Sequence, residues 1–343
     1  MRPVHKVLSI SILLVFILLL SNCKLVFYGI GQGVGQMKII WKAKPIEKVM
    51  KDPNVSDSLK QKLLLVQSIK KYAEDTLGLN SSKNYNTLYD QHGEDILWVV
   101  TAAPKYSVEP YLWKFPVVGA VPYKGYFKLE KAEKEALKMK EQGYDVRIGT
   151  VSAWSTLGFF KDPILSGMLD RSEGMIARLI IHELTHSTLY VKGNSEFNEN
   201  LATFVGNQGS KQYLIDKYGE NSKQYKDYLG ELNDIELFSN FVLRGAKQLD
   251  SLYQSFTNET EAPKDSLKTA MIKQIVANID TVHFYNKHNF SRFKNPDNLP
   301  NNAFFAGYIT YHKQQSDLEK EFIEKFNRNF EEYLAYLKKK YKK

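Results

Sequence analysis

The spacing of hydrophobic and polar positions predicts a helix near the start of the folded body and another before the main chemical motif. Apolar residues recur at helical intervals from Ser56 to Leu77, with Ser56 or Asp57 as the N-terminal cap and Gly78 as the stop. A charged helix is expected over 129–142, where Gly143 ends it. Beyond Arg171 almost every segment has a helical pattern.

Between these helices the pattern changes to that of β-strands. Strands are predicted over 96–103, 114–121 and 144–151, with a turn or bulge over 123–127. A small sheet followed by a long helical region is the organisation of an α+β protein. We therefore predict a mainly helical α+β body whose small β-sheet precedes the helix that carries the main motif.

The segment Gly29–Gln36 has glycine at every second position. No strand–helix–strand unit follows it, so the run lacks the context of a dinucleotide-binding fingerprint. We interpret it as a flexible entry loop.

The N-terminus has the features of an export signal. Arg2 and Lys6 precede an apolar stretch over 8–20, and the segment ends at Ser21-Asn22-Cys23. This ending resembles a bacterial lipoprotein box, in which the cysteine is lipidated, although Asn22 replaces the usual small residue. Counted from Val7 through Cys23, the segment is at the lower length limit for spanning a bilayer, so a retained anchor helix remains the alternative.

Composition limits the location and the partners further. Cys23 is the only cysteine, which excludes an intrachain disulfide and a thiolate metal cluster. The net charge of +9 is spread along the chain and no nucleic-acid-binding motif is present, so we expect no nucleic acid partner. A thiol-free body suits the cell envelope, facing the periplasm or the exterior. Lys24, rather than an acid after the cysteine, favours the outer membrane where there is one.

The strongest chemical signal is the sequence His182-Glu183-Leu184-Thr185-His186, inside a segment predicted to be helical over 175–190. Residues four apart lie about 40° apart around a helix, so both histidines can bind one ion. Neutral imidazoles suit zinc, and Glu183 is placed to take a proton from water. A buried helix with three hydrogen-bonded polar side chains is the alternative, but burial of three ionisable groups is costly without a compensating ion.

The third ligand must come from another segment. A three-histidine site would need glycine at 189 and histidine at 192, but those residues are Leu189 and Lys192. After Gly193 a second helix is predicted, and a helical hairpin of this length can return Glu199 to the level of His186. We prefer Glu199 to Glu196 because small apolar residues follow it. This ligand set leaves a fourth zinc position for water.

Motifs over nearly the whole chain after Cys23 resemble the predicted bacterial aminopeptidase family, a group of zinc-dependent, lipoprotein-type proteins among the gluzincin metallopeptidases. The sequence shares these stretches with that family: 28–36, 76–79, 99–104, 115–119, 123–127, 153–158, 162–163, 182–186, 197–199, 301–303 and 310–311. The resemblance implies one Zn²⁺ per chain at His182, His186 and Glu199, with Glu183 as the catalytic base. Many gluzincins have an acid where this chain has Thr203, so support for a zinc-binding histidine is expected from elsewhere.

The resemblance and the motif together predict a membrane-anchored zinc metallopeptidase of the aminopeptidase type that acts on peptides. Extended substrates usually pair with an edge strand, and 149–156 is the candidate, with Ala153, Trp154 and Ser155 as substrate-binding residues. An interior strand with Trp154 in the core is the alternative. Tyr311 is the first choice for the group that stabilises the oxyanion.

Several alternatives stay open at this point. Tyr308, His283 and Tyr126 are the next candidates for the oxyanion. Exopeptidase and endopeptidase action are not distinguished. The competing function is a non-catalytic envelope lipoprotein with a structural zinc site that serves as a binding or scaffold module.

The predicted domain organisation is simple. Residues 1–22 form a signal peptide or anchor, and 23–343 form one metallopeptidase domain. Within that domain a part with the small sheet covers about 24–165, and a helical part covers about 166–343.

Overall fold

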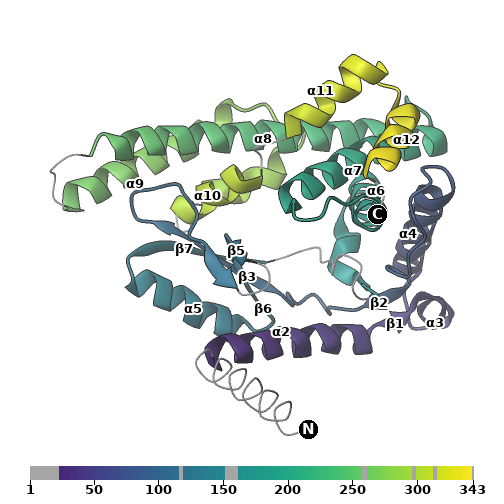
Figure 1. Cartoon of the computed structure of the whole chain (residues 1–343), viewed down its shortest axis with the longest axis horizontal. Helices are drawn as coiled ribbons and strands as arrows, with labels where there is room; N and C mark the ends of the chain where they lie inside the picture. Colours follow the sequence, from purple (N-terminus) through teal and green to yellow (C-terminus); the bar gives the residue numbers. More distant parts are fainter. Residues whose placement is uncertain are drawn as a thin grey trace, which may run out of the picture.

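The computed structural model describes residues 23–115, 119–150, 161–256, 261–295, 299–311 and 315–341. The short strands lie in the middle of the molecule, with the long C-terminal helices above them and further helices below (Figure 1). All described strands precede Ser166, and the segments after it are helical. The mainly helical α+β fold predicted from the sequence is confirmed.

The central sheet contains β3 (Trp98–Pro104), β6 (Lys124–Tyr126) and β7 (Tyr144–Thr150), in the order β6-β3-β7. Both pairings are antiparallel. α5 (Leu129–Glu141) packs on one face of this sheet and α10 (Asn302–Tyr311) on the other (Figure 1). The strands predicted over 96–103 and 144–151 and the helix predicted over 129–142 correspond to β3, β7 and α5.

Two predictions for the neighbouring segment are wrong. The stretch 114–121 is not one strand, because β4 (Trp113–Phe115) and β5 (Gly119–Val121) pair antiparallel with Phe115 opposite Gly119. Such a register requires the chain to reverse between them. The stretch 123–127 contains strand β6, since pairing with β3 orders residues that look like a turn when taken alone.

A second small sheet joins segments far apart in sequence and was not predicted. It contains β1 (Lys44–Pro45), β2 (Thr87–Tyr89) and β8 (Ile164–Leu165), in the order β1-β2-β8. β8 leads directly into the 3₁₀ turn η1 (Ser166–Asp170) and then into the helix of the main motif. This sheet therefore fixes where that helix begins.

The glycine-rich segment Gly29–Gln36 is not a loop but part of helix α2 (Cys23–Lys42). Its inner side approaches the sheet closely, because a Cβ at Gly35 would lie only 2.2 Å from the Phe127 ring. Tyr28 and Gln32 also donate hydrogen bonds to the Gly125 carbonyl, at 3.0 and 2.9 Å. Glycine here allows close packing rather than flexibility.

The other helices complete the body. The two that follow α2 are α3 (Ile46–Lys51) and α4 (Asp57–Asp75), and α4 is the helix predicted over 56–77. The C-terminal part contains α6 (Glu173–Thr188), α7 (Ser195–Tyr218), α8 (Lys223–Gln254), α9 (Glu261–Ala277), the 3₁₀ turns η2 (Asn278–Thr281) and η3 (Lys287–Lys294), α11 (Gln315–Phe326) and α12 (Phe330–Tyr341).

The largest hydrophobic cluster combines the two parts of the chain. Buried residues of α3 and α4 pack with those of α6, α7 and α12. A second cluster lies between α8, α9 and α10, and a third between α5 and the central sheet. The sheet-containing part and the helical part therefore share one core.

Candidate metal centre

Helix α6 presents His182, Glu183 and His186. The Ser172 side chain caps its start by accepting a hydrogen bond from the Met175 N–H at 3.3 Å. Most of the helix is buried, including Ile180, Ile181 and Leu184, which flank the motif. The burial holds the two histidine side chains in a fixed place, as a preformed site requires.

The turn between α6 and α7 is tied to the first turn of α7. The Asn194 side chain accepts a hydrogen bond from the Phe197 N–H, which caps α7. The buried Asn198 side chain accepts from the Val191 N–H at 2.7 Å and donates to the Val191 carbonyl at 2.8 Å. These bonds fix the residue next to Glu199.

α6 and α7 cross in close contact beside the first histidine. A Cβ at Gly206 would lie 2.9 Å from the Arg178 carbonyl oxygen and 3.2 Å from the His182 Cβ. Glycine is thus required for this approach of the two backbones. The close crossing brings a side chain of α7 within reach of both histidines of α6.

Three side chains meet at one point. The His182 and His186 Nε2 atoms lie 3.2 Å apart, and each lies 3.4 Å from an oxygen of Glu199. Ligand atoms around a tetrahedral zinc with bonds near 2.05 Å stand roughly 3.3 Å apart. The separation of the two nitrogens, and that of each nitrogen from its nearer Glu199 oxygen, are close to this value, so the three side chains can reach one ion. Among the described residues, this is the one group of three histidine, cysteine or acidic side chains with such spacing.

The charges of the cluster favour a cation. Partial burial opposes ionisation of Glu199, but its interactions with His182 and His186 outweigh this effect and lower the pKa of Glu199. His186 is buried, whereas the Glu199 side chain is 52% exposed. One side of the cluster is therefore accessible to water, as a fourth zinc position would need. Glu196, the alternative to Glu199, is exposed and is not part of the group.

Glu183 lies beside a buried tyrosine that the sequence did not point to. Burial, together with the charges of Glu183 and Asp162, raises the pKa of Tyr85 well above its usual value. The Tyr85 backbone N–H donates to the Asp162 carbonyl at 2.7 Å and its φ is 62°, so its position is closely defined. Oε2 of Glu183 is itself buried. A carboxylate in such surroundings is suited to proton transfer.

Tyr123 is a second residue that sequence reasoning missed. It stands between β5 and β6, and partial burial together with the charge of Glu199 raises its pKa. An electrostatic interaction between residues so far apart in sequence leaves no local pattern. Only the pairing of β6 with β3 and the packing of α7 bring them near.

The candidates for the oxyanion group predicted from the sequence were Tyr311, Tyr308, His283 and Tyr126. Three of them lie in other parts of the fold, and the side chain of Tyr311 is outside the described part. Tyr126 is buried in the cluster of the central sheet, and Tyr308 packs in the cluster between α8 and α9. His283 is exposed in the segment after η2. Tyr311 ends α10, and its side chain is outside the described part.

The candidate substrate strand is described only in part. β7 pairs with β3, and within the described sheet no strand covers its other edge. Gly149 and Thr150 are the last described residues of this edge strand, and the rest of the predicted stretch 149–156 lies outside the described residues. The Asn301 side chain donates to the Val146 carbonyl of this strand at 2.9 Å. Ala153, Trp154 and Ser155 lie outside the described residues.

The structure says little about the predicted membrane attachment. Cys23 begins α2, and its side chain is outside the described part. In the portion of the chain that the structure covers, none of the helices is both long and apolar enough to cross a bilayer.

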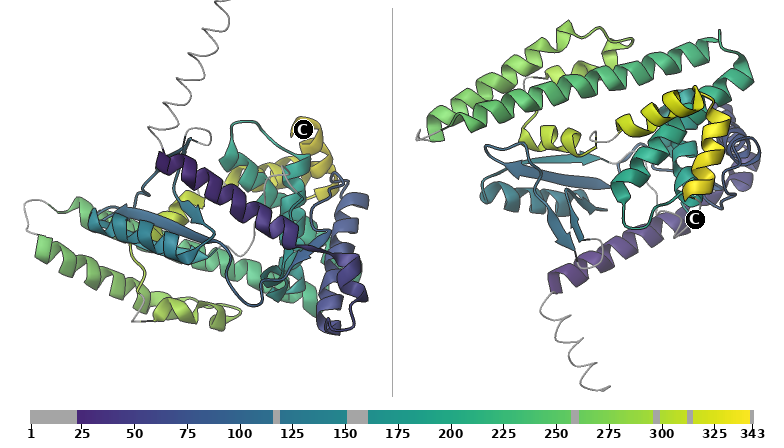
Figure 2. Two further views of the ribbon diagram at one scale, coloured as in Figure 1. Left: turned by 90° about the horizontal axis from the view of Figure 1, so that it is seen from below. Right: turned by 45° about the horizontal axis from the view of Figure 1, so that its top comes forward.

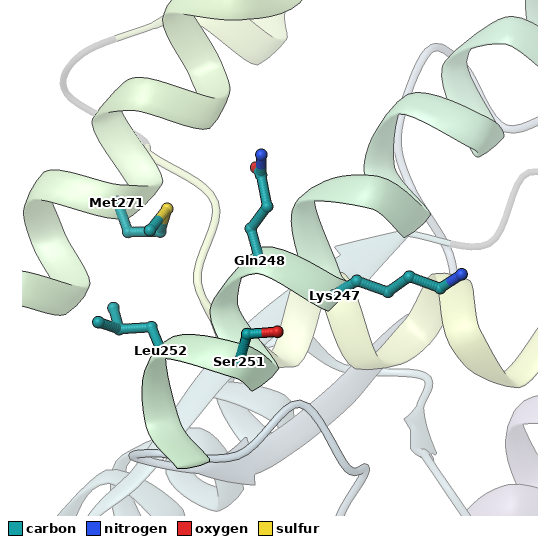
Figure 3. A pocket seen from close by; sticks show the side chains of 5 residues that line it. All are labelled: Lys247, Gln248, Ser251, Leu252 and Met271. Atoms are coloured by element: carbon teal, nitrogen blue, oxygen red, sulfur yellow. The ribbon is translucent and has the colours of Figure 1, made fainter. Parts of the chain in front are cut away.

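An open hollow lies between α8 and α9. It is lined by Lys247, Gln248, Ser251, Leu252 and Met271 (Figure 3). Lys247 points away from Met271, and no group of the metal cluster lines the hollow.

These observations define a mainly helical α+β protein in which a helical hairpin directs two imidazoles and one carboxylate at a single point. The chain belongs to the family described as "Putative aminopeptidase", whose model matches residues 27–342. The family resemblance noted from the sequence is therefore confirmed, and membership supports a peptidase as the general class of function. No curated protein and no solved structure matches the chain.

Proposed function

We propose that the protein is a zinc metallopeptidase that removes residues from the N-terminus of peptides. The observation that carries this proposal is the convergence of three side chains, since the His182 and His186 Nε2 atoms lie 3.2 Å apart and each lies 3.4 Å from one of the two carboxylate oxygens of Glu199. The family supports the peptidase class, and its description supports the aminopeptidase type.

His182, His186 and Glu199 would hold the ion. Zinc supplies Lewis acidity, which polarises carbonyl groups and makes water more acidic. Glu183 takes a proton from the attacking water and later delivers it to the leaving amine nitrogen. Tyr85 is buried and its pKa is raised in part by the charge of Glu183, so it belongs to the surroundings of the proposed base.

We propose Tyr123 as the hydrogen-bond donor to the developing oxyanion. Its raised pKa keeps the phenol protonated, and the effect of the Glu199 charge on this pKa supports a position close to the metal cluster. A Tyr123→Phe variant should lose one transition-state hydrogen bond, which typically lowers kcat about 10²–10³-fold. Zinc content should not change. A Tyr311→Phe variant provides the comparison, and an effect confined to that variant would return the role to Tyr311.

The proposed location is the cell envelope, with attachment through a lipid on Cys23 or through the apolar residues 8–20. Mass spectrometry of the N-terminus of the protein isolated from membranes tests this. A cleaved and lipidated Cys23 would distinguish a lipoprotein from a retained anchor.

Metal analysis combined with a peptide-library digest tests the enzyme. The protein purified without added metal should contain one zinc ion per chain, and Glu199→Gln should reduce its zinc affinity. Glu196→Gln is the matched control, since this exposed acid lies on the same helix outside the cluster. Equal zinc loss in both variants would contradict the ligand assignment.

The digest separates catalysis from a structural zinc. Free peptides should be shortened from the N-terminus, and the same peptides with acetylated N-termini should resist. Glu183→Gln should abolish cleavage with zinc retained. If the zinc-loaded protein cleaves no peptide, or if Glu183→Gln cleaves as well as the parent, the scaffold function is the better account.

A further inference from the structure

The outer face of α2 carries exposed apolar side chains in one line. Ile30 is 56% exposed, Val34 64% and Trp41 77%. At about 100° per residue these three positions fall within roughly 40° of each other around the helix, with Met37 in the same sector. Among the other exposed large apolar residues of the described chain, only Leu129 and Leu137 share a helix, α5, and the rest lie on separate elements or loops, as on ordinary soluble surfaces.

The opposite side of α2 is the side that holds it to the body. Tyr28 and Gln32 donate hydrogen bonds to Gly125, and Gly35 faces the Phe127 ring. The apolar line therefore points away from the protein. Seen from below, α2 lies in front of the sheet with no other element over it (Figure 2, left), and it runs along the lower edge of the molecule in Figure 1.

The charged residues of α2 itself are all basic. α2 contains no acidic residue, and Lys38 and Lys42 are exposed along one flank of the apolar line. Beyond the helix Lys44 and Lys48 are exposed, together with one acid, Glu47. Apolar side chains bordered by lysines are the composition of a helix that lies in the interface of an anionic membrane. Tryptophan is the residue most typical of that interface.

The position of α2 in the chain also favours a membrane as its partner. The described part of α2 starts at Cys23, the proposed lipidation site, and it follows the apolar stretch 8–20 in the chain. Ile30 follows Cys23 by about 10 Å of helix and Trp41 by about 27 Å. An attachment at one end and an apolar face along the length would bring the whole helix to the bilayer.

We propose that α2 lies flat on the membrane, with Ile30, Val34, Met37 and Trp41, here called the α2 stripe, in the headgroup region and the lysines on anionic lipid. This inference rests on the proposed attachment of the N-terminus to a membrane and does not depend on peptidase activity. Its consequence is a fixed orientation of the body, because α2 is bonded to β6 in the central sheet.

Quenching of Trp41 in vesicles tests the proposal. The full-length protein is reconstituted in vesicles of phosphatidylethanolamine and phosphatidylglycerol whose acyl chains are brominated close to the headgroup. Tryptophan emission of the parent should be quenched, and the quenched component should disappear in Trp41→Phe. Replacement of phosphatidylglycerol by phosphatidylcholine, or added salt, should reduce the quenching because the lysines then lose their partners.

Polar substitutions in the α2 stripe supply the second arm. The double variant Ile30→Ser with Val34→Ser should reduce quenching of Trp41, whereas Leu137→Ser, an exposed leucine of α5, should not. Neither variant should alter zinc content or hydrolysis of soluble peptides, which are measured on the same samples.

The outcomes separate the proposals. Protein retained by the vesicles with unquenched Trp41 overturns the α2 proposal and leaves the attachment intact. Protein that the vesicles do not retain overturns both. If the double variant dissociates a dimer in detergent and leaves the quenching unchanged, the α2 stripe binds a second copy of the chain instead. Loss of peptide hydrolysis with normal quenching affects only the proposed enzyme.

Discussion

Substitution of Gly206 by alanine tests the packing that brings the three ligands together. The added Cβ would lie 2.9 Å from the Arg178 carbonyl oxygen and 3.2 Å from the His182 Cβ. Both neighbours belong to the body of α6, so neither can rotate away as a flexible side chain would. The two helices must separate by several tenths of an ångström at the level of the first histidine.

The expected cost is the difference between two effects. Overpacking in a tight core destabilises by about 1–3 kcal/mol. Alanine in place of glycine within a helix restores about 1 kcal/mol. We therefore expect a net loss of about 1 kcal/mol in the free energy of unfolding of zinc-free protein. Zinc affinity should fall about tenfold or more, as it does when groups that orient a ligand are displaced.

Urea unfolding followed by circular dichroism measures the stability, and competition with a chelating indicator measures the zinc affinity. Gly307→Ala on α10 is the matched control, because a Cβ there meets no atom within 4 Å. That variant should be as stable as the parent or up to about 1 kcal/mol more stable. If Gly206→Ala behaves like Gly307→Ala in both assays, the close crossing of α6 and α7 is not what places the ligands.

Three further predictions follow from individual contacts. Asn198→Ala removes both hydrogen bonds to Val191 and should cost about 2–3 kcal/mol in urea unfolding; unchanged zinc affinity would show that this turn does not position Glu199. Asn302 is buried and bonds to two carbonyls and one hydroxyl, so Asn302→Ala should cost about 2–4 kcal/mol in the same assay, and a loss near zero would contradict the assigned bonds. Burial opposes ionisation of Glu135, but bonds from Trp113 and Lys124 outweigh it and lower its pKa. The parent should therefore exceed Glu135→Gln in thermal stability above about pH 4.5, and the difference should shrink as pH falls through the lowered value; a constant difference would contradict this.

The helices with strong local signals were predicted to within a few residues. α4 runs from Asp57 to Asp75 against a prediction of 56–77, and α6 from Glu173 to Thr188 against 175–190. In both cases a serine side chain caps the first turn, and apolar residues at helical spacing face the core. Caps and periodicity depend on neighbours in sequence, so the sequence alone contains them.

The glycine-rich start of α2 shows where local reasoning is wrong. Glycine at every second position lowers helix propensity, which favours a loop when the segment is considered alone. The sheet overrides that preference, because Gly35 allows α2 to approach Phe127 closely. The Gly125 carbonyl also accepts hydrogen bonds from two side chains of α2. Propensity is a weak guide when packing against another element decides the conformation.

The residues of the candidate site also differ in how far local sequence patterns predict their positions. His182 and His186 converge because of helical geometry, and Glu199 joins them because a short turn after Gly193 reverses the chain. Both effects act within a span of fewer than about twenty residues, so spacing alone indicates them.

Tyr123 and Tyr85 reach the site by a different route. Tyr85 follows α4 and lies near Glu183 only because β2 pairs with β8, which leads into α6. Tyr123 lies near Glu199 only because β6 pairs with β3 at the edge where α2 is bonded. Each contact depends on pairing between distant segments, which no local pattern encodes. The metal ligands of such a site can therefore be predicted from one sequence, whereas the groups that would tune the base and the oxyanion need the fold. If Tyr123→Phe proves neutral, the ligand prediction stands and only the part derived from these distant contacts must be revised.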